Sequence, residues 1–188
     1  MRHYVIKKGE ELEVIKTKGF TPENAIGILP AGIPREDWPF IQANQSNDEL
    51  GQPVWNITVD TTAKAEAEAA ASQQAQIEAA YNSMVKDIYD ELYNVFRTRQ
   101  PETATAEKET WDDMLLTPAN YASLGLTVDH QLNNADGTEL FSPGSALDTA
   151  EKITAYATRK LEQVRAYGPY RMQRKQQFYN ERAAILGS

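Results

Sequence analysis

Cysteine is absent from this chain of 188 residues. Its absence excludes disulfide bonds, thiolate metal sites and cysteine nucleophiles, and it leaves the redox compartment undetermined. Long hydrophobic runs are also missing, because no stretch approaches the roughly 20 apolar residues that a membrane-spanning helix needs. The opening residues, MRHYVIKKGEELEVIK, alternate charged and apolar side chains, so we expect no signal peptide. We therefore expect a protein that is made in a cytoplasm, stays soluble and does not bind a membrane.

Positive charge is scarce: 19 Lys and Arg face 27 Asp and Glu, which gives a net charge of −8. Because a phosphate-binding surface needs an excess of Lys and Arg, we do not expect nucleic acid as the partner. The cations gather at the end of the chain, where residues 159–188 hold seven Lys or Arg and two Glu. Aromatic side chains accompany them, so a nucleic-acid surface is the alternative to a favoured amphipathic helix whose arginines meet water or an acidic neighbour. Attraction between this basic end and the acidic remainder can operate within or between subunits.

Residues that usually carry catalysis are few. The two histidines are His3 and His130, and His130 follows Asp129 with Ser123 and Ser142 nearby in the sequence. Neither serine stands in a Gly-x-Ser-x-Gly turn, and proximity in sequence is not the geometry of a catalytic triad. We interpret His130 as a solvated histidine in a turn.

Oxygen ligands do not form a recognisable metal site either. The stretch LNNADGTELFSP resembles a calcium loop at Asn134, Asp136 and Gly137. Leu132 and Pro143 would then occupy the first and last ligand positions, and neither supplies a side-chain oxygen, so a β-turn is favoured. We predict no catalytic residue, no cofactor and no metal, and we do not expect an enzyme. A second acidic group predicts an exposed helix face and no ligand set: Glu107, Glu109, Asp112 and Asp113.

Residues 1–59 predict a small, loop-rich β module. The apolar runs at 4–6 and 12–15 flank a turn at Gly9, which is typical of a hairpin. Pro22 suits the first turn of a short helix, and PVWNITVD predicts one more strand. Three further prolines are expected to keep the chain extended or turning: Pro30, Pro34 and Pro39.

Residues 60–98 predict one long helix with Asp60 as its N-cap. The Ala-rich segment, residues 63–76, buries little area per residue and suits close contact between chains or spacing. Residues 77–96 carry enough bulk to contact both a partner helix and the C-terminal domain. If fully helical, the stretch spans roughly 55 Å. A seam at alternate steps of four and three residues predicts packing against other helices: Ala63, Ala67, Ala70, Gln74, Ile77, Tyr81, Met84, Ile88, Leu92 and Val95.

Residues 99–188 predict a helical C-terminal domain. Pro101 should end the long helix in a solvated link, after which Thr103 or Thr105 caps a second helix. A short helix should follow Thr117, begin at Pro118 and end at Gly125.

Two further features complete this domain. Turn residues 134–137 predict a small hairpin or folded loop. Asp148 and Glu151 form a capping-box pattern, and the helix that they begin should be interrupted at Gly168 and Pro169. The expected fold class is therefore α+β and mainly α.

The junction PVWNITVDTTAKAEAEAAASQQAQ and the tail RMQRKQQFYNERAAIL resemble small structural proteins of tailed bacteriophages, in which a compact module precedes an alanine-rich helix. The junction is also similar to tail fibre assembly chaperones and their neighbours. The resemblance covers about half of the chain and transfers no functional residue. It implies a role in the virion or its assembly, at the tail or its fibres, with protein partners only.

Two hypotheses follow. The favoured one is a permanent structural component of a phage tail or tail-fibre complex, made in the host cytoplasm and located in the virion. The second is a chaperone that binds a fibre protein transiently. A homo-oligomer is expected, with a trimer favoured, because a symmetric bundle covers a thin alanine seam. A monomer with a mobile helix and a helical protein that binds host factors are the remaining alternatives.

Overall fold

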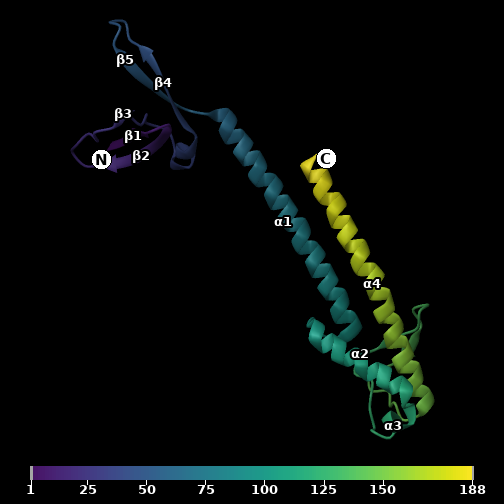
Figure 1. Ribbon diagram of the computed structural model, residues 1–188. Coiled ribbons are helices and arrows are strands. Elements are labelled where there is room, and N and C mark those ends of the chain that lie inside the picture. The colour runs from purple at the N-terminus through teal and green to yellow at the C-terminus, as the bar shows by residue number, and fades with distance from the viewer. Residues whose placement is uncertain (1, 188) are drawn as a thin grey trace. The chain divides into compact units, whose positions relative to one another are not determined.

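The computed structural model describes residues 2–187 and shows an α+β protein that is mainly helical, as the sequence predicts (Figure 1). The chain divides into two compact units, residues 1–74 and 75–188. Small antiparallel sheets belong to the first unit, and the helical domain with its small hairpin belongs to the second. In the sequence, the boundary falls inside the long helix α1 (Thr61–Phe96).

The predicted N-terminal hairpin is confirmed. Its strands pair antiparallel over their full length, and Gly9 turns the chain with φ 67°. The middle strand is apolar at its centre, and Tyr4, Val5 and Ile6 are buried. The sheet has three strands in the order β2-β1-β3: β1 (Arg2–Lys8), β2 (Glu11–Thr17) and β3 (Ala25–Ile28).

The short helix that was expected at Pro22 is absent, and that prediction is wrong. The Pro22 carbonyl accepts a hydrogen bond from the Ala25 amide at 3.1 Å, which closes a turn into β3. Because β3 pairs with β1 from Ala25 onward, the chain has no room for a helix here. A short 3-10 helix, η1 (Arg35–Phe40), comes later and holds Pro39 inside it.

A second hairpin joins β4 (Ile41–Asn47) to β5 (Pro53–Val59). The strand over PVWNITVD is confirmed as β5, whereas its partner β4 was not predicted because IQANQSN is mostly polar and exposed. β5 also packs closely on β3. A Cβ atom at Gly27 would lie 2.7 Å from Ile57 Cδ1, so a larger residue there would require the end of the Ile57 side chain to shift.

The predicted N-cap of α1 is confirmed. Asp60 Oδ1 accepts hydrogen bonds from the amides of Thr62 at 3.1 Å and Ala63 at 2.9 Å. Lys64 in the first turn pairs with Asp37 of η1 at 2.5 Å, and this hydrogen bond raises the lysine pKa. At the other end Arg97 adopts φ 52°, a left-handed conformation that stops the helix.

Helix α2 (Pro101–Leu116) begins at the proline itself. The link between α1 and α2, residues 97–100, is mostly exposed, as predicted. The threonine caps are wrong, since Thr105 Oγ1 donates to the Pro101 carbonyl at 3.0 Å. Proline suits the first helical position because the N–H that it lacks would have no helical partner there. Helix α3 (Pro118–Ala122) and the turn at Gly125, with φ 65°, agree with prediction.

The small hairpin is confirmed as β6 (Leu132–Asn133) and β7 (Glu139–Phe141). Helix α4 (Ala150–Leu186) then begins, but the predicted capping box is wrong. Thr149 Oγ1 accepts the Lys152 amide at 3.2 Å, and the Asp148 carboxylate pairs with the Lys152 ammonium at 2.7 Å.

Gly168 and Pro169 do not interrupt α4, so this expectation is also wrong. Both residues lie on the exposed face of the helix, as does Arg165 one turn earlier. Proline cannot donate a hydrogen bond to the carbonyl four residues before it, and on this exposed face water can satisfy that carbonyl.

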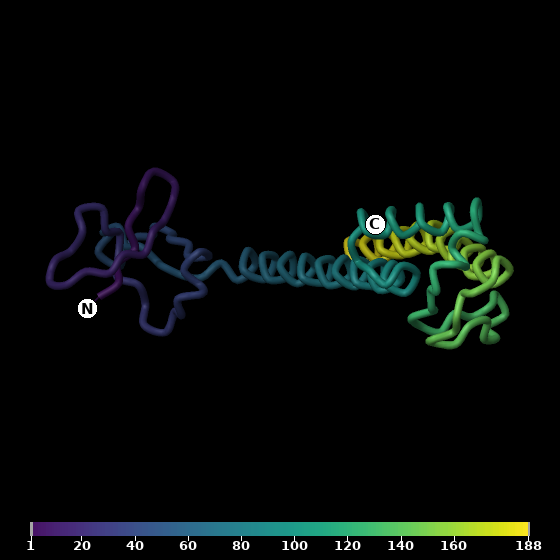
Figure 2. Tube along the Cα trace, turned by 90° about the horizontal axis from the view of Figure 1, so that it is seen from below, coloured from purple at the N-terminus to yellow at the C-terminus, as the bar shows by residue number. Residues whose placement is uncertain are grey.

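The core of residues 75–188 lies where the end of α1, helices α2 to α4 and the small hairpin meet. In both views α1 and α4 lie side by side within this unit (Figures 1 and 2). The Phe96 ring stacks on Trp111 at 5.4 Å between centroids, and Phe141 meets Tyr156 edge-on at 6.2 Å. Val128, Leu132 and Ile153 are among the most deeply buried members of the same cluster.

Candidate assembly surface

The predicted seam of α1 lies in two environments. In the Ala-rich segment, Ala63 is half-buried, whereas Ala67, Ala70 and Gln74 are exposed. Farther along, Ile77 and Ile88 are half-buried and Tyr81 is 49% exposed. The chain itself buries the remaining three seam residues: Met84, Leu92 and Val95.

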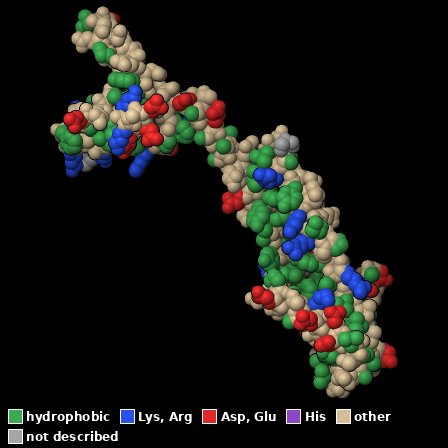
Figure 3. Space-filling model, in the orientation of Figure 1, with side chains coloured by type: hydrophobic (Ala, Val, Ile, Leu, Met, Phe, Trp, Pro, Cys, Tyr) green, Lys and Arg blue, Asp and Glu red, His purple; other side chains and the backbone are tan. Residues whose placement is uncertain are grey.

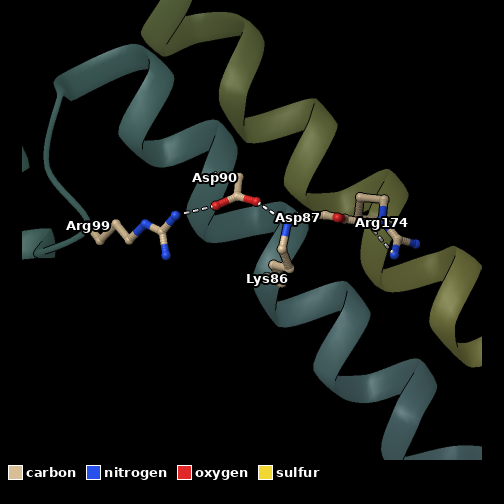
Figure 4. Close-up of polar contacts among 5 residues, drawn as sticks. All are labelled: Lys86, Asp87, Asp90, Arg99 and Arg174. Carbon is tan, nitrogen blue, oxygen red and sulfur yellow. Dashed lines mark hydrogen bonds and ion pairs between the residues drawn. The ribbon is translucent and has the colours of Figure 1, made fainter.

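Side-chain contacts hold the later half of α1 against α4 (Figure 4). Asp87 Oδ2 accepts from Arg174 Nε at 3.1 Å and lies 2.9 Å from its Nη2. Farther along the same two helices, the Tyr81 and Phe178 rings meet edge-on at 5.7 Å. The two helices therefore have a fixed level relative to each other, with residue 87 opposite residue 174.

Asp90 holds the chain that leaves α1. Its carboxylate pairs with Lys86 at 2.6 Å and with Arg99 from the loop that precedes α2 (Figure 4). The hydrogen bond from Lys86 is the main cause that lowers the pKa of Asp90. Because Asp90 pairs with Lys86 of α1 and with Arg99 of the loop, it holds the turn between α1 and α2 in place.

An apolar groove with a volume of about 220 Å³ runs between α1 and α4. Hydrophobic side chains gather over these two helices, with basic side chains beside them (Figure 3). We call this feature the α1–α4 groove. It is lined by Tyr81, Met84, Val85, Ile88, Tyr89, Leu92, Pro101, Tyr167, Arg171 and Lys175.

Two cations of the groove have no partner within residues 2–187. Neither Arg171 nor Lys175 forms an ion pair or a side-chain hydrogen bond with another described residue. Arg174, their neighbour on α4, is satisfied by Asp87 and by Gln177 at 2.9 Å. The groove therefore combines apolar side chains with positive charge that residues 2–187 leave unpaired.

A second feature of this unit is the buried side chain of Lys160, which has an exposure of 0%. Its Nζ donates to the Val95 carbonyl at 3.1 Å and lies 3.0 Å from His130 Nε2. The ammonium also stands 5.1 Å from the centre of the Trp111 ring. These contacts tie the end of α1 to α4 through the loop that carries His130.

The hydrogen bond from Lys160 requires an unprotonated Nε2, so the proton of neutral His130 lies on Nδ1, which contacts Asp129. Burial is the main cause that lowers the pKa of His130, and the Lys160 charge adds to it. Burial likewise lowers the pKa of Lys160 to about 8. The lowered pKa of His130 favours the neutral histidine that this arrangement requires.

Burial also shifts the pKa values of two side chains near Lys160, Glu107 and Tyr156. Burial raises the pKa of the Glu107 carboxyl, and the Lys160 charge opposes that shift. Burial also raises the pKa of Tyr156 to about 12. Glu107 is half-buried, so the prediction that it belongs to an exposed acidic face is wrong for this residue.

The interpretation of His130 as a solvated histidine is wrong, since its side chain is only 13% exposed and contacts both Asp129 and Lys160. Neither candidate serine joins it. Ser123 Oγ donates to the Asn120 carbonyl at 2.7 Å, and Ser142 Oγ donates to Glu139 Oε1 at 2.5 Å. Neither serine forms a hydrogen bond with His130, so these residues do not form a catalytic triad.

Lys160 is not among the predicted residues, although its position in the sequence indicates burial. Lys160 lies on the apolar stripe of α4, three residues after Ala157 and seven after Ile153, both of which are fully buried. A lysine at such a position is expected to be buried and paired.

Among residues 2–187, no three His, Asp or Glu side chains come together in a way that could hold a metal ion. In the same part of the chain, no helix is both long enough and apolar enough to cross a bilayer. Comparisons with known proteins give no match: no protein-family model, curated protein or solved structure is detectably similar to this chain.

Proposed function

We propose that this protein is a structural component of the tail or tail-fibre complex of a tailed bacteriophage. It acts by assembly, with α1 as the helix that joins subunits and with other tail or fibre proteins as further partners. It is made in the host cytoplasm and becomes part of the virion. The phage assignment rests on the resemblance of the junction and the tail, and the assembly role rests on the surfaces of α1.

The observation that carries the assembly role is the exposed seam of the Ala-rich segment. Ala67, Ala70 and Gln74 form one face of a continuous helix and remain uncovered. Helices in proteins gain most of their stability from the packing of one face, and no described element of its own unit covers this face. A partner chain is the simplest source of that packing.

The buried lysine cluster supports a structural role for the core. Lys160 has a lowered pKa, as a catalytic lysine often does, but its exposure is 0%. A substrate cannot reach Nζ while Val95, His130 and Trp111 surround it. The cluster therefore serves to join α1, α4 and the loop at His130.

A transient assembly chaperone is the alternative, and exposed leucines favour it. Leu116 is 79% exposed at the end of α2, and Leu124 is 64% exposed after α3. Uncovered apolar side chains of this kind can hold a client protein.

Mass spectrometry of purified phage particles separates the two roles. A structural component is expected in the particles at a fixed ratio to the other tail proteins. Its absence from the particles, together with its recovery in complex with a fibre protein from infected cells, would replace the structural role with the chaperone.

A further inference from the structure

The α1–α4 groove needs an occupant with defined properties. Its apolar wall, from Tyr81 to Leu92, requires a partner surface that approaches closely. Its rim holds Arg171 and Lys175, which lack an acidic partner among the described residues. An occupant with small side chains and a carboxylate at its flank would satisfy both requirements.

The Ala-rich segment of the same chain has these properties. Its exposed face consists of Ala67, Ala70 and Gln74, and Glu66 stands at the flank of that face. Glu66 forms no ion pair with any residue that the structure describes. At 100° per residue, the alanine face points in the same direction as Tyr81 and Ile88 of the groove.

A parallel bundle would not use these surfaces well. A parallel seam would have to use Met84, Leu92 and Val95, which their own chain already buries. In the α1–α4 groove, the apolar side chains that a second copy can still cover are Tyr81 and Tyr89, which are 49% and 39% exposed. Parallel copies would also place Glu66 beside Glu66 and leave Lys175 without a carboxylate. An antiparallel pair removes both difficulties.

We propose that two copies of this chain pair through antiparallel α1 helices, so that the Ala-rich segment of each copy covers the α1–α4 groove of the other. This inference rests on the proposed assembly function and names the partner as a second copy. Each copy supplies one segment and one groove, so the contact is reciprocal and closes as a two-fold dimer.

The level of the pairing follows from charge. If the two α1 helices cross at residue 76, residue 66 of one copy lies level with residue 86 of the other, since both are ten positions from the crossing. Arg174 is level with Asp87, which brings Lys175 next to that position. Glu66 of one copy then meets Lys175 of the other, and Ala67 faces Val85.

Disulfide cross-linking tests the direction of the pairing, because the chain has no cysteine of its own. Purified Ala67→Cys and Val85→Cys variants are mixed, equilibrated and oxidised. We expect a covalent dimer in the mixture and little cross-linking of either variant alone. A covalent dimer of Ala67→Cys by itself would place residue 67 beside its own copy, as in a parallel pair or a pair that crosses at residue 67, and would overturn the proposal.

Steric variants test the alanine face, with the solution mass from light scattering as the readout. Ala70→Arg places a bulky charge on the face, whereas the matched control Ala69→Arg places the same side chain about 100° around the helix, off that face. Both positions are exposed within the chain, so folding should be retained. We expect a dimer for the native chain and Ala69→Arg, and a monomer for Ala70→Arg. A monomeric native chain, or equal dimerisation of both variants, contradicts the proposal.

Charge reversal tests the predicted ion pair. Lys175→Glu should weaken dimerisation by about fivefold or more for each contact, and the combined Glu66→Lys and Lys175→Glu variant should restore it. No restoration would contradict the level of the pairing.

The dimer experiments and the test of the phage proposal can fail independently of each other. A native trimer with parallel cross-links would overturn the two-fold dimer and leave the assembly role standing. Absence of the protein from purified particles would overturn the structural role, and a dimer in solution would still support the pairing.

Discussion

The two halves of α1 share a backbone conformation and differ in what surrounds them. The Ala-rich segment exposes Ala67, Ala70 and Gln74, whereas the later half buries Met84, Leu92 and Val95. One seam pattern runs through both. This difference in burial shows that a seam of apolar residues predicts which face of a helix packs. It does not predict whether the same chain or another chain covers that face.

The two halves also owe their helical state to different causes. In the first half, alanine has the highest intrinsic helix propensity and Asp60 satisfies the first turn. In the second half, packing against α4 and α2 stabilises the helix, with Phe96 stacked on Trp111. Substitutions should therefore have large effects in the second half and small ones in the first.

The largest effect is expected from Leu92→Ala in the packed half. The variant removes a buried side chain of the core cluster, and we expect the free energy of unfolding to fall by about 2–5 kcal/mol. Urea denaturation followed by circular dichroism measures the change. A loss of less than about 1 kcal/mol would show that the later half of α1 is not packed as described.

A pH-dependent effect is expected from Lys160. Its pKa in the folded protein is about 8, below the 10.5 of an ordinary lysine, so the unfolded chain binds more protons between these values. The free energy of unfolding should therefore increase with pH across this window, by about 2 kcal/mol from pH 7.5 to 9.5.

Lys160→Met is the control for this prediction, since it keeps much of the side-chain volume and removes the titrating group. The increase with pH should be absent from the variant when the two proteins are compared by urea denaturation. Parallel pH profiles for both proteins would refute the assignment of a low pKa to Lys160.

A smaller effect is expected from the ion pair between α1 and α4. A double-mutant cycle of Asp87→Ala and Arg174→Ala should give a coupling energy of about 0.5–1 kcal/mol, because the Arg174 side chain is only 14% exposed. The Lys108 and Asp112 pair within α2 is a matched control, with both side chains nearly half exposed. An equal coupling for the two pairs would remove any special role for the contact between helices.

The smallest effect is expected from Ala69→Gln in the exposed half. Glutamine has a helix propensity close to that of alanine, and position 69 lies outside the seam, so stability should change by less than about 0.5 kcal/mol. Thermal unfolding of the variant beside the native chain measures the change. A larger loss would mean that this side of the segment is packed as well.

Local signals predicted much of the fold. The hairpin at Gly9, the cap at Asp60, the strand over residues 53–59 and the short helix at Pro118 each depend on a few neighbouring residues. Where two local signals competed, prediction failed. Thr149 outranked Asp148 as the cap of α4, and Pro101 served as a helix start where a helix end was expected.

Contacts between residues that are far apart in the chain could not be predicted from the sequence. Strand β4 is polar, and only its pairing with β5 makes it a strand. Pro169 is tolerated because that face of α4 is exposed, a fact that depends on the packing of the opposite face. Lys160 meets Val95 and His130 across 65 and 30 residues of chain, and no spacing in the sequence indicates such contacts.

Hydrogen exchange of the α1 amides, measured at low and at high protein concentration, tests the central claim most directly. We predict that exchange in the Ala-rich segment slows as the concentration rises, because a second copy covers that segment, while exchange from Met84 to Phe96 stays slow at both concentrations. Fast exchange in residues 63–76 at every concentration would contradict the claim that another copy of the chain covers this half of α1.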